Sequence, residues 1–295
     1  MSENRILLIE NPAHLSVDHK RLKIAVKGEE ARYVLPSDIS VLVLHHPEVT
    51  LTVHALQRLA GAGASVLLTD ASHMPAGQLW PSNGQSVMGK RLRQQIALEQ
   101  TNDGEGLWRR IVRAKINAQA ATLRWAERAG ALRLERFARQ VAPGDPKNIE
   151  AQAARHYWKH LFSPEFRRVR PNADDPQNTR LNYGYAVLRS LVARQLAASG
   201  LNPVLGLGHR QIDNPFNLAD DFMEPYRHAV ERQVVQADME AEFDGQERVR
   251  GLAFLESEVR LSRGEFRLPN AIAESVDSYC RFLDGKSKSL DLPRF

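Results

Sequence analysis

The sequence predicts an α+β protein in which a small N-terminal β-rich domain precedes a larger all-α domain. Residues 1–75 contain short apolar runs bounded by turn residues, which is typical of strands. Within residues 90–285, apolar residues recur at helical spacing instead. Residues 76–89, rich in Gly, Pro, Ser and Asn, are expected to form a linker between the two domains. A chain of 295 residues is long enough to bury a sizeable core.

The first domain is predicted to hold several strands and one local helix. The apolar runs that predict strands are residues 5–10, 22–26, 41–44 and 65–69. Between the last two runs, Val53, Leu56 and Leu59 recur at helical spacing and predict a helix that ends at Gly61 and Gly63. The GAGAS segment that follows precedes a strand and does not open a helix, so it is interpreted as a helix end and not as a phosphate loop.

Helices are predicted throughout the second domain. From Lys90 to about Arg139 the apolar positions keep to one helical face, namely Ile111, Ala114, Ala118, Ala121 and Trp125. Further helices are predicted over 148–162, over 182–199 and within 217–243. The final segment, residues 286–295, has little apolar content, so we expect it to be a mobile tail.

Composition excludes several classes of protein. Cys280 is the only cysteine, which excludes a disulfide within the chain and a cysteine-based zinc site. The first residues do not have the pattern of a secretory signal, and no apolar run approaches the ~18–20 residues of a membrane span. We therefore expect a cytoplasmic protein.

Positive charge is concentrated in the middle of the chain. The net charge is +5 overall, but residues 90–180 alone carry +9, while residues 1–89 and 181–295 carry −1 and −3. Arginine supplies most of the excess, and its planar guanidinium suits phosphate contacts. Two interpretations follow: a surface for a polyanion such as nucleic acid, or a solvated face of charged helices. Candidate contacts for nucleic acid are Arg109, Arg110, Arg113, Arg167 and Arg168.

A carboxylate heads an apolar stripe in the helix predicted over 148–162. Asn148 is a plausible N-cap, and the face that starts at Glu150 continues with Ala154, Tyr157 and Leu161. A carboxylate in such a position is costly unless it is paired, hydrogen-bonded or bound to a metal. The alternative is a helix-start glutamate that the helix dipole favours.

Two further segments carry imidazole or carboxylate groups. His209 follows a turn with Gly206 and Gly208, and Asp221 and Glu224 share a helical face with the i,i+3 spacing. Each has a structural alternative, since loop histidines and acidic helix faces are common on surfaces. Together with Glu150 they would form a mixed oxygen and nitrogen site for Mg²⁺ or Mn²⁺, which suits phosphodiester chemistry. Spacing alone does not show that the three segments meet.

Five segments resemble one known family. They are LWRRIVRAKINAQA (107–120), GDPKNIEAQAARHYWKHLF (144–162), LNYGYAVLRSLVARQL (181–196), GLNPVLGLGH (200–209) and NLADDFMEPYR (217–227). In order and spacing they resemble the CRISPR spacer-acquisition integrase, the universal CRISPR-associated adaptation endonuclease. The sequences of the third and fifth segments most resemble those of the branch that accompanies a single large RNA-guided effector nuclease.

The resemblance implies a metal-dependent DNA endonuclease and integrase that inserts short duplex fragments into a CRISPR array by transesterification. It places the catalytic metal ligands on Glu150, His209 and Glu224, with Asp221 as an accessory group, and the metal as Mg²⁺ or Mn²⁺. It implies a homodimer formed through the β-rich domain, and partners in double-stranded DNA and the small second CRISPR adaptation protein. Gly208 and His228 depart from the family pattern. The alternative function is a DNA-binding scaffold without an active metal site.

Overall fold

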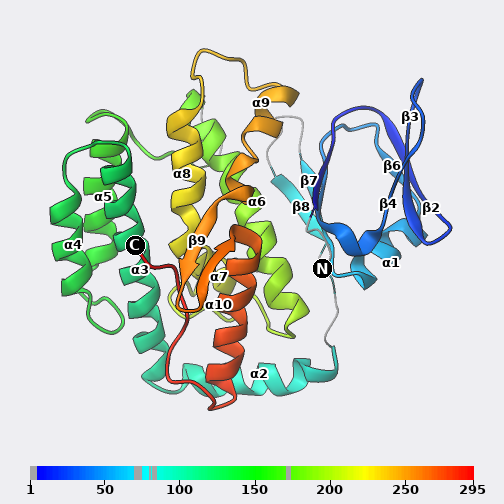
Figure 1. Cartoon of the computed structure of the whole chain (residues 1–295). Coiled ribbons are helices and arrows are strands. Elements are labelled where there is room, and N and C mark those ends of the chain that lie inside the picture. The colour runs from blue at the N-terminus through cyan, green and yellow to red at the C-terminus, as the bar shows by residue number, and fades with distance from the viewer. Residues whose placement is uncertain (1–4, 70–74, 80, 82–84, 171–173) are drawn as a thin grey trace.

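The computed structural model describes residues 5–69, 75–79, 81, 85–170 and 174–295. Figure 1 shows an N-terminal part built of strands beside a larger part built of helices, with α6 between the two. This confirms the predicted α+β class. None of the helices in the described ranges is long and apolar enough to cross a membrane.

The N-terminal part contains two four-stranded sheets. The first has the order β1-β5-β7-β8, with β8 antiparallel to β7 and the other pairs parallel. The second has the order β4-β3-β2-β6. The strands are β1 (Arg5–Ile9), β2 (Ala13–Asp18), β3 (Arg21–Val26), β4 (Arg32–Val34), β5 (Ile39–Leu44), β6 (Thr50–Leu51), β7 (Ser65–Thr69) and β8 (Pro75–Leu79). Helix α1 (Val53–Gly61) begins at Thr52, whose hydroxyl accepts a hydrogen bond from the Ala55 amide.

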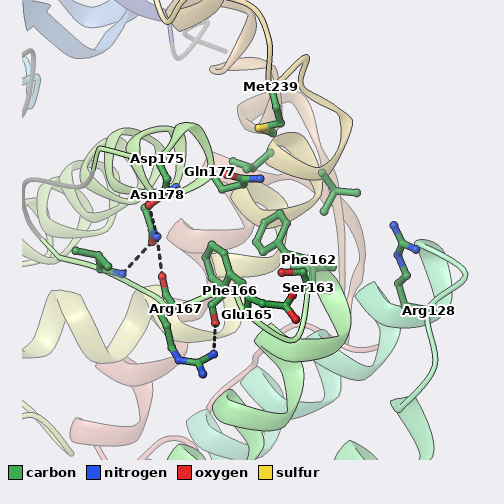
Figure 2. A pocket seen from close by; sticks show the side chains of 14 residues that line it. Arg128, Phe162, Ser163, Glu165, Phe166, Arg167, Asp175, Gln177, Asn178 and Met239 are labelled. Carbon is green, nitrogen blue, oxygen red and sulfur yellow. Dashed lines mark hydrogen bonds between the residues drawn. The ribbon is translucent and has the colours of Figure 1, made fainter.

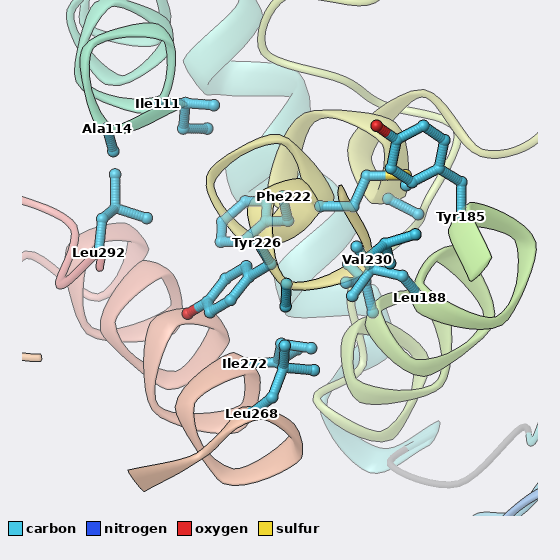
Figure 3. Close-up of a cluster of buried hydrophobic side chains, with 14 of the residues drawn as sticks. Ile111, Ala114, Tyr185, Leu188, Phe222, Tyr226, Val230, Leu268, Ile272 and Leu292 are labelled. Carbon is cyan, nitrogen blue, oxygen red and sulfur yellow. The ribbon is translucent and has the colours of Figure 1, made fainter. Parts of the chain in front are cut away.

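The helical part is built around α3 and α6. Its helices are α2 (Gln85–Glu99), α3 (Asp103–Trp125), α4 (Ala131–Gln140), α5 (Ile149–Leu161), α6 (Pro176–Ala198), α7 (Asn217–Met223), α8 (Arg227–Gln236), α9 (Gly245–Arg250) and α10 (Leu268–Leu283). A 3₁₀ turn, η2 (Glu224–Tyr226), joins α7 to α8. Figure 3 shows Ile111 of α3, Leu188 of α6, Phe222 of α7 and Ile272 of α10 in one buried cluster.

One hydrophobic core joins the helices to the first sheet. Val41 and Val43 of β5 and Leu67 of β7 belong to the same buried cluster as the helical side chains. The hydroxyls of Ser65 in β7 and Ser190 in α6 lie 3.3 Å apart in this region. The sheet therefore positions α6, and with it the rest of the helical part.

The structure corrects two expectations, one about the second part of the chain and one about the linker. The second part is not all-α, because β9 (Glu258–Leu261) and β10 (Gly264–Arg267) form an antiparallel hairpin. Much of the expected linker 76–89 is regular structure, since β8 ends at Leu79 and α2 starts at Gln85. Residues 80 and 82–84 of that linker lie outside the described residues. Proline and glycine suit β8 because it is an edge strand with only β7 beside it.

The expectation of a mobile tail at 286–295 is also wrong. Leu290 and Leu292 are buried, and Figure 3 shows Leu292 pointing toward Ala114 of α3. Asp291 holds this segment through its backbone: its amide donates to Ser278 Oγ (2.9 Å), and its carbonyl accepts from Ser275 Oγ (2.5 Å). The low apolar content predicted a mobile segment, but two buried leucines and a hydrogen-bonded backbone are enough to hold it against the helices.

Replacing Leu292 with Ala should therefore destabilise the protein by about 2–3 kcal/mol, because it opens a cavity in a packed site. The matched control is Lys288→Ala in the same segment, where the exposed side chain leaves stability within about 0.5 kcal/mol of wild type. Denaturant unfolding of both variants measures the difference. Equal stabilities would contradict the docked tail.

Candidate functional site

Glu150 is presented by a doubly capped helix start. The Asn148 side chain accepts from the Ala151 amide, as predicted. Asp145 adds a second cap, because its two carboxylate oxygens accept from the amides of Ile149 and Glu150, each at 2.9 Å. Both capping residues adopt left-handed backbone conformations, with φ of 47° at Asp145 and 49° at Asn148. This turn fixes the first residues of α5 and aims Glu150 toward α3.

Lys115 of α3 links two of the predicted site residues. Its Nζ lies 2.5 Å from Glu150 Oε1 and 2.6 Å from Glu224 Oε2. Lys115 and Glu224 are both buried, whereas the Glu150 side chain is about one quarter exposed. Burial lowers the pKa of Lys115, but the charges of Glu224 and Glu150 outweigh that effect and raise its pKa overall. The ammonium therefore stays charged between the two carboxylates.

A second cation holds the other oxygen of Glu224. Arg227 lies one turn further along the chain, and its guanidinium is 2.9 Å from Glu224 Oε1. Burial raises the pKa of Glu224, yet Arg227 and Lys115 together lower it below its ordinary value. Because Arg227 also stacks on the ring of Tyr185, 4.8 Å from its centroid, its guanidinium is fixed in place.

His209 is held by Asp221, and Asp221 by the loop that carries His209. The Asp221 oxygens accept from the backbone amides of Leu207, Gly208 and His209, at 2.5, 3.0 and 3.0 Å. Nδ1 of His209 lies 2.7 Å from Asp221 Oδ1. A carboxylate accepts hydrogen bonds, so this contact assigns the ring proton to Nδ1 and leaves Nε2 as the nitrogen that can bind a ligand.

The two glycines of this loop are required by close approach. A Cβ at Gly206 would lie 2.2 Å from the His209 carbonyl oxygen, and one at Gly208 would lie 2.3 Å from the Trp108 ring. The same Trp108 ring meets His209 edge to face, with centroids 5.6 Å apart. Gly208, where the sequence departs from the family pattern, therefore makes room for Trp108.

The hydrogen bond that His209 donates to Asp221 raises the pKa of His209, against burial, which lowers it. Burial raises the pKa of Asp221 itself. The charge of His209 in turn lowers the pKa of Glu224, so the two groups belong to one electrostatic neighbourhood. The structure thus brings Glu150 and Glu224 onto one ammonium, with the His209–Asp221 pair beside them.

A buried network behind Arg227 supports the site. Glu231 accepts hydrogen bonds from Tyr157 (2.5 Å) and Tyr185 (2.7 Å), and burial raises the pKa of Glu231. Tyr185 lies between Arg227 and Arg168, whose guanidinium is 5.2 Å from the ring centroid. These tyrosines lie on α5 and α6, so the network ties both helices to α8.

Lys115, Arg227 and Glu231 are not among the site residues that the sequence predicts. Lys115 left one signal: it follows Ile111 by four residues, so a charged side chain interrupts a buried helical face. Arg227 and Glu231 have the same spacing on α8, and nothing in a single sequence links them to Tyr157 and Tyr185 across the core.

The predicted arginine contacts have different environments. Arg110, Arg113 and Arg167 are exposed, and the first two line a cavity of 350 Å³ beside the C-terminal segment. Arg109 is half-buried. Arg168 donates to Asn178 (2.8 Å) and Asn182 (2.6 Å), and its burial lowers its pKa to about 10. Arg168 therefore holds the start of α6.

A larger cavity, of 520 Å³, lies at the far end of α5 (Figure 2). Phe162, Phe166, Arg167 and Met239 are among its lining residues, and none of the predicted metal ligands is. The predicted metal ligands and this cavity are therefore in different places.

The donor set suits a hard divalent cation. Two carboxylate oxygens converge on one point, and the Lys115 ammonium stands there as a cation. Among the described residues, no three His, Cys, Asp or Glu side chains converge closely enough to hold a metal as they stand. Glu224 Oε2 is buried, and its contact within the described ranges is the ion pair with Lys115 Nζ, so it already binds a cation. The residues fit a divalent ion once Lys115 withdraws.

A family model and two curated relatives all match this chain as similar to Cas1 proteins. The family model described as "CRISPR associated protein Cas1" matches residues 6–247. The chain is 37% identical over 298 residues to the CRISPR-associated endonuclease Cas1 of Neisseria meningitidis, covering 98% of this chain and 95% of that one. It is 30% identical over 278 residues to a CRISPR-associated endonuclease Cas1 of Pyrobaculum aerophilum, covering 88% and 90%.

Solved structures share the fold. A casposase bound to its integration product superposes with a TM-score of 0.80 at 19% identity, covering 97% of this chain and 92% of that chain. A Cas6-RT-Cas1–Cas2 complex gives 0.79 at 19%, covering 98% and 36%. A Cas1 protein from Thermotoga maritima gives 0.77 at 16%, covering 97% and 99%.

Breaking the buried ion pairs should destabilise the metal-free protein. Glu224→Gln leaves Lys115 and Arg227 buried without their shared counter-charge, so we expect a loss of about 3–5 kcal/mol. Glu150→Gln should cost less, because Glu150 is partly exposed and Lys115 keeps Glu224.

Denaturant unfolding at pH 7 in EDTA measures both changes, with the exposed Glu165→Gln as the control. A Glu224→Gln protein as stable as the control would contradict the charge cluster.

Proposed function

Because the chain belongs to the Cas1 family of CRISPR-associated proteins, we propose that it is a DNA endonuclease and integrase that inserts short duplex fragments into a CRISPR array. The observation that carries this proposal is the convergence of Glu150 and Glu224 on a single cation site, in a chain that matches curated Cas1 endonucleases over nearly its whole length. Two carboxylates and an imidazole around one cation suit phosphodiester chemistry.

Glu150, Glu224 and Nε2 of His209 would hold the divalent ion, Mg²⁺ or Mn²⁺. When bound, such an ion polarises the phosphoryl oxygens and stabilises the charge of the transition state. Asp221 keeps the His209 ring in the orientation and tautomer that present Nε2. Since both Asp221 oxygens already accept hydrogen bonds, its role is to position His209 and not to bind the ion.

The reaction is a transesterification at phosphorus. The 3′ hydroxyl of the fragment loses its proton as its oxygen attacks a backbone phosphate of the repeat and forms a new P–O bond. The bond from that phosphorus to the 3′ oxygen of the repeat strand breaks, and the released 3′ oxygen takes up a proton. The helices contribute positioning, because Asp145 caps α5 and the Tyr185–Glu231 network fixes α8.

Exposed arginines on α3 would hold the DNA backbone. Arg110 and Arg113 are one turn apart and open to solvent, so their guanidinium groups can reach phosphates without reading bases. A DNA contact by Arg168 stays a prediction, since its guanidinium is half-buried and already donates to Asn178 and Asn182.

We propose that the chain acts as a homodimer through its β-rich part. Large apolar side chains are exposed there, including Tyr33, Leu35 and Val53, which is 71% exposed. Sedimentation of the free protein checks this, and a monomer at micromolar concentration would contradict it.

We further propose that the protein assembles with the small second adaptation protein; a solved neighbour is named a Cas6-RT-Cas1–Cas2 complex. We also propose that the protein works in the cytoplasm. Its branch would be the one that accompanies a single large effector. Co-purification with the second adaptation protein tests the assembly.

The second candidate function is a DNA-binding scaffold without catalysis. The observation in its favour is Lys115, which stands where a metal would bind. Nicking or strand transfer on branched DNA, with Mn²⁺ or with EDTA, separates the two. Binding that persists while no product appears with Mn²⁺ would favour the scaffold.

Glu150→Gln, His209→Gln and Glu224→Gln should each abolish Mn²⁺-dependent strand transfer, because each removes a ligand. Asp221→Asn should leave measurable activity, since it disturbs the orientation of His209 and its loop but removes no ligand; losses of about 10–100-fold are typical of such partners. The control is Asp213→Asn, an exposed acid in the loop that carries His209. An inactive Asp221→Asn beside a Glu224→Gln that recovers at saturating Mn²⁺ would reverse the two roles.

Reversing charge on α3 should weaken DNA binding for all sequences alike. For Arg110→Glu/Arg113→Glu, the slope of log affinity against log salt should flatten by roughly one unit for each DNA phosphate that the variant no longer neutralises. The control is Arg263→Glu, an exposed site on the β9–β10 turn. An unchanged slope would mean that this face is merely solvated.

A further inference from the structure

We propose that Lys115 is a built-in cation that holds Glu150 and Glu224 together in the metal-free protein, and that an incoming divalent ion displaces its ammonium toward Gln119. The inference rests on the proposed function, because it takes the two glutamates as metal ligands. It adds a residue that competes with the metal for the site.

The ammonium and a divalent ion cannot share this position. Lys115 Nζ lies 2.5 Å from Glu150 Oε1 and 2.6 Å from Glu224 Oε2. A Mg²⁺ ion needs oxygens at about 2.0–2.1 Å and would take the same two atoms. Two positive charges this close repel each other strongly where little water screens them. Metal entry therefore requires that the ammonium leaves.

Of the two cations on Glu224, Lys115 is the one that can move. Arg227 is stacked on Tyr185, and its guanidinium lies 2.9 Å from Glu224 Oε1. The lysine has a flexible four-carbon stem and a compact charge, whereas the arginine fork is held on two sides. Arg227 would thus keep the Glu224 carboxylate in position while Lys115 withdraws.

Gln119 offers the withdrawn ammonium an acceptor. It lies one turn after Lys115 on α3 and is 3% exposed. Its Oε1 is buried and has no hydrogen-bond partner among the described residues. Side chains of a helix lean toward its N-terminus, so the amide of Gln119 lies over the turn that carries Lys115. A buried acceptor without a donor is costly, and the displaced ammonium would satisfy it.

The test measures Mn²⁺ binding to the full chain by calorimetry, together with the melting temperature with and without Mn²⁺. Lys115→Met should bind Mn²⁺ about tenfold more tightly than wild type, because no resident cation competes. Its metal-free melting temperature should fall, and the rise on adding Mn²⁺ should exceed that of wild type. Lys159→Met, at an exposed position on α5, is the control.

Gln119→Leu provides the second arm. It should bind Mn²⁺ several-fold more weakly than wild type, because the ammonium loses its acceptor while the ligands stay. Unchanged Mn²⁺ affinity in Lys115→Met overturns the proposal. If that variant fails to fold, unchanged affinity in Gln119→Leu overturns it instead. If wild type binds no Mn²⁺, or if Glu150→Gln binds Mn²⁺ as well as wild type does, the proposed function itself is refuted, whatever Lys115 does.

Discussion

The carboxylate of Glu224 is buried and is compensated by two cations, and the arrangement of the helices around it follows from that pairing. Glu224 is 2% exposed and sits on the short turn between α7 and α8, so water cannot neutralise it. Lys115 approaches from α3 and Arg227 from α8, one for each oxygen. Because Lys115 also contacts Glu150, the same requirement draws the start of α5 to α3. Three chain segments therefore meet at the site, namely α3, the start of α5 and the turn into α8, and their two carboxylates and two cations compensate one another.

The second constraint is the loop that carries His209. A single carboxylate, Asp221, collects three consecutive backbone amides and the imidazole. At Gly206 and Gly208 this loop leaves no space for a side chain, because a Cβ there would collide with neighbouring atoms. The helix that supplies Asp221 leads directly into Glu224, so the position of His209 and that of the buried carboxylate are set by one element. We infer that a change in this loop would act on both groups together.

Local patterns sufficed to predict much of the fold. The runs at 41–44 and 65–69 and the spacing of Val53, Leu56 and Leu59 became β5, β7 and α1, because each pattern expresses the burial of its own segment. The hairpin of β9 and β10 and the docked tail depend on distant partners: Asp291 is held by Ser275 and Ser278 of α10. The predicted ligands come from motifs, but Lys115 becomes part of the site only through packing, which a single sequence does not express. Arg168 shows a further limit of the sequence: its charge suggested a surface role, but its contacts with Tyr185, Asn178 and Asn182 also depend on distant partners.

The central claim is that Glu150, Glu224 and His209 surround a cation position that Lys115 fills when no metal is bound. The most direct measurement is a crystal structure of the protein soaked in Mn²⁺, with anomalous scattering recorded at the manganese edge. We expect an anomalous peak bounded by the two carboxylates and Nε2 of His209, with the Lys115 ammonium turned away. A peak elsewhere, or no peak while Lys115 still bridges the two glutamates at saturating Mn²⁺, would contradict it.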